Sequence, residues 1–136
     1  MIKFNRHPKV GFVASCFDLL HAGHCLMLKD AKQQCDYLVA ALQTDPTIDR
    51  PDTKNKPLLS LKERRILLES NKYVDEIIEY STEKDLEKIL ENLLPDVRIL
   101  GSDYIGKAAT GSLYCKEIYY HNRNHDYSTT NIRKKL

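Results

Sequence analysis

Five short apolar runs recur along the chain, separated by longer polar or mixed segments. They lie at residues 9–15, 37–42, 74–78, 97–100 and 117–120. Runs of this length are too brief for helices, and continuous apolar character is typical of strands that are covered on both faces. The pattern therefore predicts a five-stranded parallel sheet.

The segments between these runs carry helical patterns and helix-start signals. Residues 23–34 follow the first strand, and Ser60 with Glu63 fits a capping box. Thr82 would cap a helix over residues 83–94, which Pro95 ends, and Ser128 would cap a terminal helix. The apolar faces predicted for the first three helices are Leu26, Met27 and Ala31; Leu61, Ile66, Leu67 and Leu68; and Leu86, Ile89, Leu90 and Leu93.

Strands that alternate with helices predict an α/β fold with right-handed crossovers. A length of 136 residues with 42% hydrophobic content suits one packed core, so we expect a single domain over residues 1–136. Ligands of open α/β sheets bind outside the carboxyl ends of the strands, where the strand order switches direction. The segments that follow the strands should therefore converge on one site.

Charge and cysteine content narrow the class of protein. The net charge is +2 with 29% charged residues, so nothing demands a nucleic-acid or membrane partner. The four cysteines, Cys16, Cys25, Cys35 and Cys115, are scattered and read as free thiols of a reducing compartment. Residues 1–9 are polar and no apolar run approaches a membrane span, so we expect no signal peptide and a soluble cytoplasmic protein.

Residues 44–59 have no hydrophobic period and contain three prolines, so they are predicted to form a long loop. Loops of this length inside a compact domain are commonly functional or mobile. The loop carries Arg50, Lys54 and Lys56. These cations are either a solvated surface or, because the loop follows the second strand, lysines that reach a bound triphosphate.

The segment from Phe12 to Leu28 combines a strand, a turn and a helix start, and it places His21 and His24 on that turn. The first N–H groups of a helix attract phosphate, and Gly23 would let a phosphate approach the backbone. The two histidines are either ordinary polar residues at a loop end or additional donors to that phosphate.

The sequence CFDLLHAGH resembles the H-x-G-H signature of the nucleotidyltransferase superfamily, in the form of small cytidylyltransferases such as glycerol-3-phosphate cytidylyltransferase. Arg123 followed by Tyr127-Ser128-Thr129-Thr130 resembles the family's R-T-E-G-I-S-T-T segment, with the same spacing from arginine to serine. Residues 72–76 and 101–104 are also similar, so the resemblance covers nearly the whole chain.

The resemblance implies a Rossmann-like fold and an enzyme that joins CTP to a small phosphorylated acceptor, most simply glycerol 3-phosphate, with release of pyrophosphate. It also implies Mg²⁺ bound mainly through the nucleotide phosphates, and a homodimer. Two alternatives stay open: an adenylyltransferase acting on a sugar phosphate such as heptose 1-phosphate, and an inactive nucleotide-binding homologue. The heptose branch also has H-x-G-H and an S-T-T-N ending, as in residues 128–131 here.

Site residues follow from the matched motifs and from the charged residues beside them. The catalytic candidates are His21, His24, Lys56 and Arg123. The nucleotide-binding candidates are Ser15, Cys16, Phe17, Asp18, His21, Gly23, His24, Lys54, Gly101, Asp103, Arg123, Tyr127, Ser128, Thr129 and Thr130. Arg64 and Thr53 are the acceptor-binding candidates, and no residue is predicted to be a metal ligand.

The chain also departs from the cytidylyltransferase pattern at three places. The family's Gly-Thr before Phe-Asp is Ser15-Cys16 here, which adds bulk near the phosphates. The family's Thr-Glu-Gly after the arginine is replaced by residues 124–126, Asn-His-Asp. A family lysine aligns with Asn55, so Lys54 or Lys56 would have to substitute for it.

Overall fold

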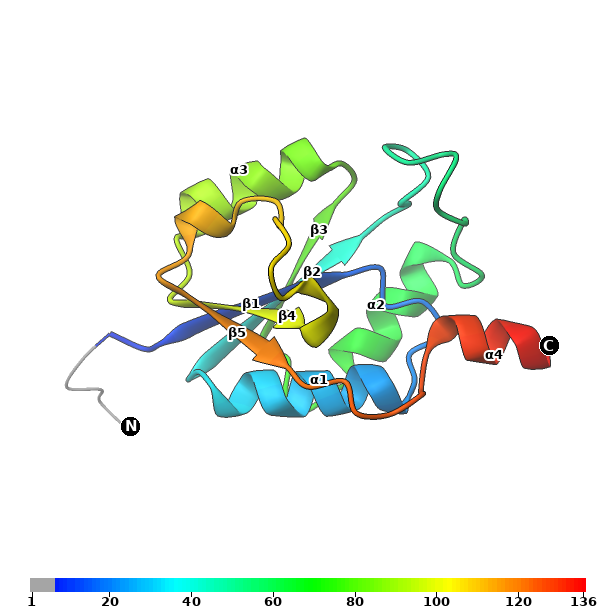
Figure 1. The fold of residues 1–136 in the computed structure, drawn as a ribbon, viewed down its shortest axis with the longest axis horizontal. Coiled ribbons are helices and arrows are strands. Elements are labelled where there is room, and N and C mark those ends of the chain that lie inside the picture. Colours follow the sequence, from blue (N-terminus) through cyan, green and yellow to red (C-terminus); the bar gives the residue numbers. More distant parts are fainter. Residues whose placement is uncertain (1–6) are drawn as a thin grey trace.

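A computed structural model describes residues 7–136, in which strands and helices alternate as the apolar pattern predicts (Figure 1). The elements are β1 (Val10–Ser15), α1 (Ala22–Gln33), β2 (Tyr37–Gln43), α2 (Leu61–Glu69), β3 (Glu76–Tyr80), α3 (Glu83–Leu93), β4 (Val97–Gly101), β5 (Glu117–His121) and α4 (Thr129–Lys135), with short 3₁₀ turns η1 (Ser102–Tyr104) and η2 (Ser112–Tyr114).

The five strands form one parallel sheet in the order β3-β2-β1-β4-β5. From β1 the chain builds outward through β2 to β3, and it then returns to the other side of β1 for β4 and β5. The strand order therefore reverses between β1 and β4, and a ligand site is expected at the carboxyl ends of these two strands. The predicted parallel α/β sheet is confirmed.

Two apolar layers cover the sheet, one on each face. Leu28 and Ala31 of α1 and Leu68 of α2 pack with alternate residues of the inner strands, among them Val13 and Ile99. On the other face, Leu86 and Leu90 of α3 pack with Phe12, Val39, Ala41 and Tyr80. Figure 1 shows α1 and α2 on one side of the sheet and α3 on the other.

The helix starts agree with their predicted caps. Ser60 and Glu63 form the capping box of α2, and Thr82 with Asp85 forms that of α3. Ser128 caps α4 through a hydrogen bond from the backbone N–H of Asn131 to its hydroxyl, at 3.0 Å. Each cap supplies partners for backbone donors that a helix cannot satisfy internally.

Two predicted apolar faces are wrong in part. Leu26 of α1 is 42% exposed and Ile66 of α2 is 52% exposed, and Leu67 is also exposed. The helices meet the sheet along narrower stripes, so that α1 buries Leu28 and α2 buries Leu68. The third strand also begins two residues later than predicted. The carbonyl of Asn71 accepts a hydrogen bond from the N–H of Val74, and this turn delays entry into the sheet.

All four cysteines are free thiols in the structure. No helix within residues 7–136 is long and apolar enough to cross a membrane. The predictions made for the extreme N-terminus, that it belongs to the domain and is no signal peptide, concern residues 1–6 in part, and these lie outside the described residues.

Candidate active site

A cavity of about 620 Å³ lies at the carboxyl ends of the strands, around the point where the strand order reverses. It extends past both faces of the sheet. Val13 and Met27 line it on the face covered by α1, and Ala14, Tyr80 and Leu86 line it on the face covered by α3. We call these parts the histidine side and the Arg98 side, after the residues that distinguish them. A cavity of this size accommodates a small-molecule ligand.

The histidine side is built on the turn between β1 and α1. Phe17 and Leu19 both have φ near +50°, a left-handed conformation that non-glycine residues rarely adopt. The buried Phe17 ring lies 5.6 Å from the His24 ring, centroid to centroid. This tight turn places the first residues of α1 directly beyond the end of β1.

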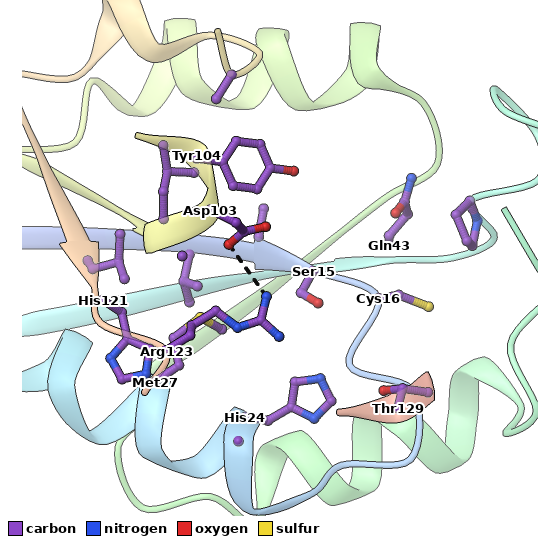
Figure 2. Close-up of a pocket in the computed structure, with 18 of the residues that line it drawn as sticks. Ser15, Cys16, His24, Met27, Gln43, Asp103, Tyr104, His121, Arg123 and Thr129 are labelled. Atoms are coloured by element: carbon purple, nitrogen blue, oxygen red, sulfur yellow. Dashed lines mark hydrogen bonds and ion pairs between the residues drawn. The ribbon is translucent and has the colours of Figure 1, made fainter. Parts of the chain in front are cut away.

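The two histidines cap α1 with their own side chains. His21 Nδ1 accepts a hydrogen bond from the N–H of Gly23 at 3.0 Å, and His24 Nδ1 accepts one from the N–H of His21 at 3.2 Å. The rings stack with centroids 3.9 Å apart. Because each Nδ1 acts as an acceptor, the proton of each neutral imidazole is on Nε2. Figure 2 shows the His24 ring directed into the cavity, between Arg123 and Thr129.

Burial keeps both imidazoles neutral. The pKa of His24 is lowered to about 3, mainly by burial and then by the adjacent His21. The pKa of His21 is also lowered, first by burial and then by electrostatic interactions with neighbours that include Arg123. At neutral pH the turn therefore presents two Nε2–H donors without adding positive charge.

Asp18, predicted to bind nucleotide, instead joins three segments of the protein. Its buried carboxylate accepts hydrogen bonds from the N–H groups of Leu58 and Leu59 at 2.9 and 3.0 Å, and from Arg133 at 3.1 Å. Its carbonyl accepts one from the Thr129 hydroxyl. Neither Asp18 nor Phe17 is among the residues that line the cavity. Both are buried in the protein interior, where they support the turn.

Gly23 lines the cavity, and a side chain at this position would also collide with the segment that leads into α4. A Cβ placed on Gly23 would lie 2.9 Å from the carbonyl oxygen of Tyr127 and 3.0 Å from His125 Cε1. The segment leading into α4 thus packs directly on the helix start. Tyr127 contributes this backbone contact and is not among the lining residues.

Arg123 follows β5 and extends into the middle of the cavity, toward Asp103 (Figure 2). Its Nη1 lies 3.5 Å from Asp103 Oδ1, and its backbone N–H donates to the Ser102 hydroxyl. A Cβ on Gly101 would lie 2.5 Å from Asp103 Oδ1 and 3.0 Å from Arg123 Cδ. Gly101, Asp103 and Arg123 therefore form one packed unit, and all three line the cavity as predicted residues of the site.

Other predicted residues divide by position. Ser15 and Cys16 line the cavity at the end of β1, and residues 128–130 line it at the start of α4. Lys54 of the 44–59 loop also lines it, together with Arg50, which pairs with Glu83 at 2.6 Å. Lys56 and Thr53 do not line the cavity, and the Lys56 carbonyl accepts a hydrogen bond from Arg133.

Arg64, predicted to bind the acceptor, is 2% exposed and does not line the cavity. Its guanidinium donates to the backbone carbonyls of Leu59, Cys16, Gln43 and Thr44. These carbonyls lie at the ends of β1 and β2 and on both sides of the 44–59 loop. The structure therefore gives Arg64 a different position from the predicted one, as the residue that holds these backbone segments together.

His121 and His125 also line the cavity, although sequence reasoning did not select them. His121 Nδ1 lies 2.8 Å from Asp30 Oδ2, so a neutral His121 keeps its proton there and presents Nε2 as an acceptor. His125 Nδ1 accepts from the N–H of Tyr127, which places its proton on Nε2. Within residues 7–136 neither Nε2 has a hydrogen-bond partner. The position of His121 at the end of β5 was a signal that could have identified it.

The arrangement suits the binding of a polyanion next to a second reactant. Neutral imidazole donors, the start of α1, Arg123 and Lys54 all contribute to the cavity wall. Burial raises the pKa of Cys16, the thiol at this wall, which keeps it protonated and a poor nucleophile. The site can thus align reactants and neutralise charge without a covalent intermediate on the protein.

Comparisons with known proteins identify the family of the chain. A family model described as cytidylyltransferase-like matches residues 12–135. The bifunctional protein HldE of Helicobacter pylori strain HPAG1 is 36% identical over 132 residues, which cover 97% of this chain and 28% of HldE. HldE of Helicobacter hepaticus is 32% identical over all of this chain and 28% of its own length. The chain thus spans little more than a quarter of these relatives.

Solved structures share the fold. A lipopolysaccharide core biosynthesis protein from Thermoplasma volcanium aligns with a TM-score of 0.65 and 25% identity, over 85% of this chain and 98% of that one. A pantoate-beta-alanine ligase from Francisella tularensis aligns with the same TM-score at 21% identity, over 95% of this chain and 66% of that one. The second similarity concerns the fold alone.

Proposed function

The chain belongs to the cytidylyltransferase-like family, and from this premise we propose that it transfers a nucleotidyl group, from ATP, to the phosphate of a sugar phosphate such as heptose 1-phosphate. The observation that carries the proposal is the pair of mutually capped histidines at the start of α1. Nucleotide binding alone does not need two neutral Nε2–H donors, whereas charge developing on phosphate oxygens does.

In the proposed reaction, a phosphate oxygen of the acceptor attacks the α-phosphorus of the triphosphate. The new bond is a P–O–P linkage, and the bond to the bridging oxygen of pyrophosphate breaks, with its electron pair leaving on pyrophosphate. The acceptor is already an anion, so no base is needed. His21 and His24 would donate to the oxygens that gain charge, and Lys54 and Arg123 would hold the outer phosphates.

ATP and a sugar phosphate take precedence over CTP and glycerol 3-phosphate, which the motifs alone favoured. Residues 128–131 and 101–104 resemble the heptose 1-phosphate adenylyltransferase branch. Similarity to the HldE proteins over nearly the whole chain supports the same branch. So does the solved structure named for biosynthesis of the lipopolysaccharide core. The CTP reaction is the second candidate, supported by Arg123 at its family position.

Magnesium and a homodimer are further parts of the proposal. Residues 7–136 contain no cluster of three or more potential metal ligands. Two carboxylates at the cavity, Asp103 and Glu83, both face arginines. These carboxylates suit an ion that keeps most of its water and phosphate ligands, to which Asp103 would add one carboxylate oxygen. When bound, Mg²⁺ would neutralise triphosphate charge. Light scattering of the purified protein tests the dimer.

The test is pyrophosphate release with Mg²⁺, in which ATP and CTP are each combined with heptose 1-phosphate and glycerol 3-phosphate. We expect release with ATP and heptose 1-phosphate. Release only with CTP and glycerol 3-phosphate would make the second candidate correct. No release in any combination, with ATP nevertheless raising the melting temperature, would contradict nucleotidyl transfer to these acceptors and leave a nucleotide-binding protein.

A further inference from the structure

Arg98 of β4 is a buried cation whose environment is not explained by the packing of the protein. It is 4% exposed and alternates with Val97 and Ile99, which face α1, so its side chain lies on the α3 face of the sheet. Within residues 7–136 it forms no ion pair with a carboxylate. An arginine in such a position is costly unless its donors are satisfied.

The hydrogen bonds of Arg98 use one side of the guanidinium. Nη1 donates to the Thr110 carbonyl and, at 3.3 Å, to the Ser112 hydroxyl. Nε is buried and has no partner in the described part of the chain. The Nε–Nη2 edge of an arginine presents two parallel N–H groups, which match two adjacent oxygen atoms. Arg98 lines the cavity, so a ligand there can supply those oxygens.

The neighbours of Arg98 include both hydrogen-bond donors and acceptors. Tyr80 and Glu83 line the same side of the cavity, and Glu83 is paired with Arg50 at 2.6 Å. The Gln43 side chain, at the end of β2, lines the cavity as well (Figure 2). The Arg50 partner offsets the charge of Glu83, but the carboxylate oxygens can still accept hydrogen bonds from hydroxyl groups. Donors and acceptors side by side are what a polyol requires.

We propose that the Arg98 side of the cavity binds adjacent hydroxyl groups of the acceptor, with the Nε–Nη2 edge of Arg98 donating to two oxygens of a vicinal diol. The inference rests on the proposed function, because it places the acceptor's sugar on this side and the nucleotide on the histidine side. It makes Arg98 a determinant of acceptor specificity, although none of the motifs matched in the sequence includes this residue.

The experiment measures binding and turnover separately. Heptose 1-phosphate and its monodeoxy analogues are titrated by calorimetry into protein saturated with a non-hydrolysable ATP analogue, for the wild type, Arg98→Met and Ser112→Ala. In the wild type we expect at least one analogue to bind about 10-fold more weakly, as loss of a hydrogen bond to a charged donor implies. In Arg98→Met the affinity for the parent sugar phosphate should fall by about the same factor. The difference in affinity between the parent and the analogue should then disappear.

Ser112→Ala is the matched control, because it removes a partner of Nη1 and leaves the Nε–Nη2 edge intact. It should bind all the sugars as the wild type does, and the affinity for the ATP analogue should be unchanged in both variants. Arg98→Lys keeps the positive charge and lacks the two parallel N–H donors of the guanidinium. It serves as the second variant if Arg98→Met does not fold.

The outcomes separate the two hypotheses. Sugar binding that depends on Arg98, without pyrophosphate release, would overturn the proposed function and support the sugar site. Suppose instead that Arg98→Met turns over heptose 1-phosphate with the KM of the wild type and discriminates against the deoxy analogues as the wild type does. This result would overturn the sugar site and leave the proposed function. A wild type that binds no sugar phosphate in the calorimeter would also overturn the sugar site.

Discussion

The two sides of the cavity are held together in different ways. On the histidine side, hydrogen bonds between residues two and three positions apart fix His21 and His24. On the Arg98 side, the contacts of Arg98 reach residues 12 and 14 positions away, and the covering segment after β4 has no regular helix or strand apart from its two 3₁₀ turns. Contacts between residues close in sequence produce a recognisable motif. Contacts between distant residues involve single positions that no motif identifies.

This difference also separates rate from specificity. The histidine side presents neutral donors on a rigid helix start, which suits stabilisation of a transition state. The Arg98 side presents a mixture of donors and acceptors under a loop segment, which suits discrimination among acceptors. Variants on the two sides should therefore change different kinetic parameters, and the following predictions test that division from the largest effect to the smallest.

The largest effect is expected for His24. His24→Ala removes an Nε2–H donor from a preorganised site, so kcat for pyrophosphate release should fall by about 10²–10³. His24→Gln is the matched variant, because glutamine at this position can still accept from the His21 N–H and preserve the helix cap. It should recover the melting temperature, and its amide N–H should recover part of the rate, because that group can replace the Nε2–H donor. A His24→Ala protein that loses melting temperature and keeps kcat would show that His24 acts only as a cap.

Substitution of Arg64 tests whether this residue binds backbone carbonyls, as in the structure, or the acceptor phosphate, as the motif alignment predicts. Arg64→Met leaves four partly buried backbone carbonyls without their donor, so the free energy of unfolding should fall by about 3 kcal/mol. The adjacent Arg65 is the control. Its ion pairs with Glu69 and Glu79 are at the surface, and Arg65→Met should cost at most about 1 kcal/mol in urea denaturation. A stable Arg64→Met with a raised acceptor KM would restore the predicted phosphate contact.

Arg64 also shows how far the sequence could be interpreted. The strands and helix caps were predictable because apolar runs and Ser, Thr and Glu side chains act within a few residues. Whether an arginine on the first turn of a helix points to solvent or to a set of backbone carbonyls depends on segments 20 to 48 residues away. The same limit explains Leu26 and Ile66, whose exposure is set by where the helices meet the sheet.

The candidate site divides along the same line. Residues of the H-x-G-H turn and of the Arg123 to Thr130 segment were selected by their motifs, and most of them line the cavity. Phe17 and Asp18 lie in the same motif, yet they face the protein interior because the turn reverses at Phe17 and Leu19. Arg98 and Tyr80 could not be selected, since they lie within β4 and β3, which are not neighbours in the sheet, and only the shared cavity relates them.

The pH dependence of stability should report on the two histidines. Both have lowered pKa values in the folded protein, and that of His24 is about 3. The unfolded chain therefore binds more protons below its own pKa of about 6.5, so the free energy of unfolding falls as the pH falls from there. The His24 contribution to this fall should be about 1–2 kcal/mol between pH 6.5 and pH 5. Urea denaturation at both pH values measures it, and a wild-type slope in His24→Gln would contradict the assignment.

The smallest expected effect distinguishes two lysines of one loop. Lys54 lines the cavity and Lys56 does not, although the two are only two residues apart. Removing one phosphate contact at a partly solvated position should raise KM for ATP by about 10-fold in Lys54→Ala, with kcat changed less. Lys56→Ala has the same net charge and should change KM by less than about 2-fold, because a distant exposed charge is screened by salt. If Lys56→Ala has the larger effect at low and at high salt, then the 44–59 loop closes differently over the nucleotide, and Lys56 is the triphosphate ligand that the motif alignment allowed.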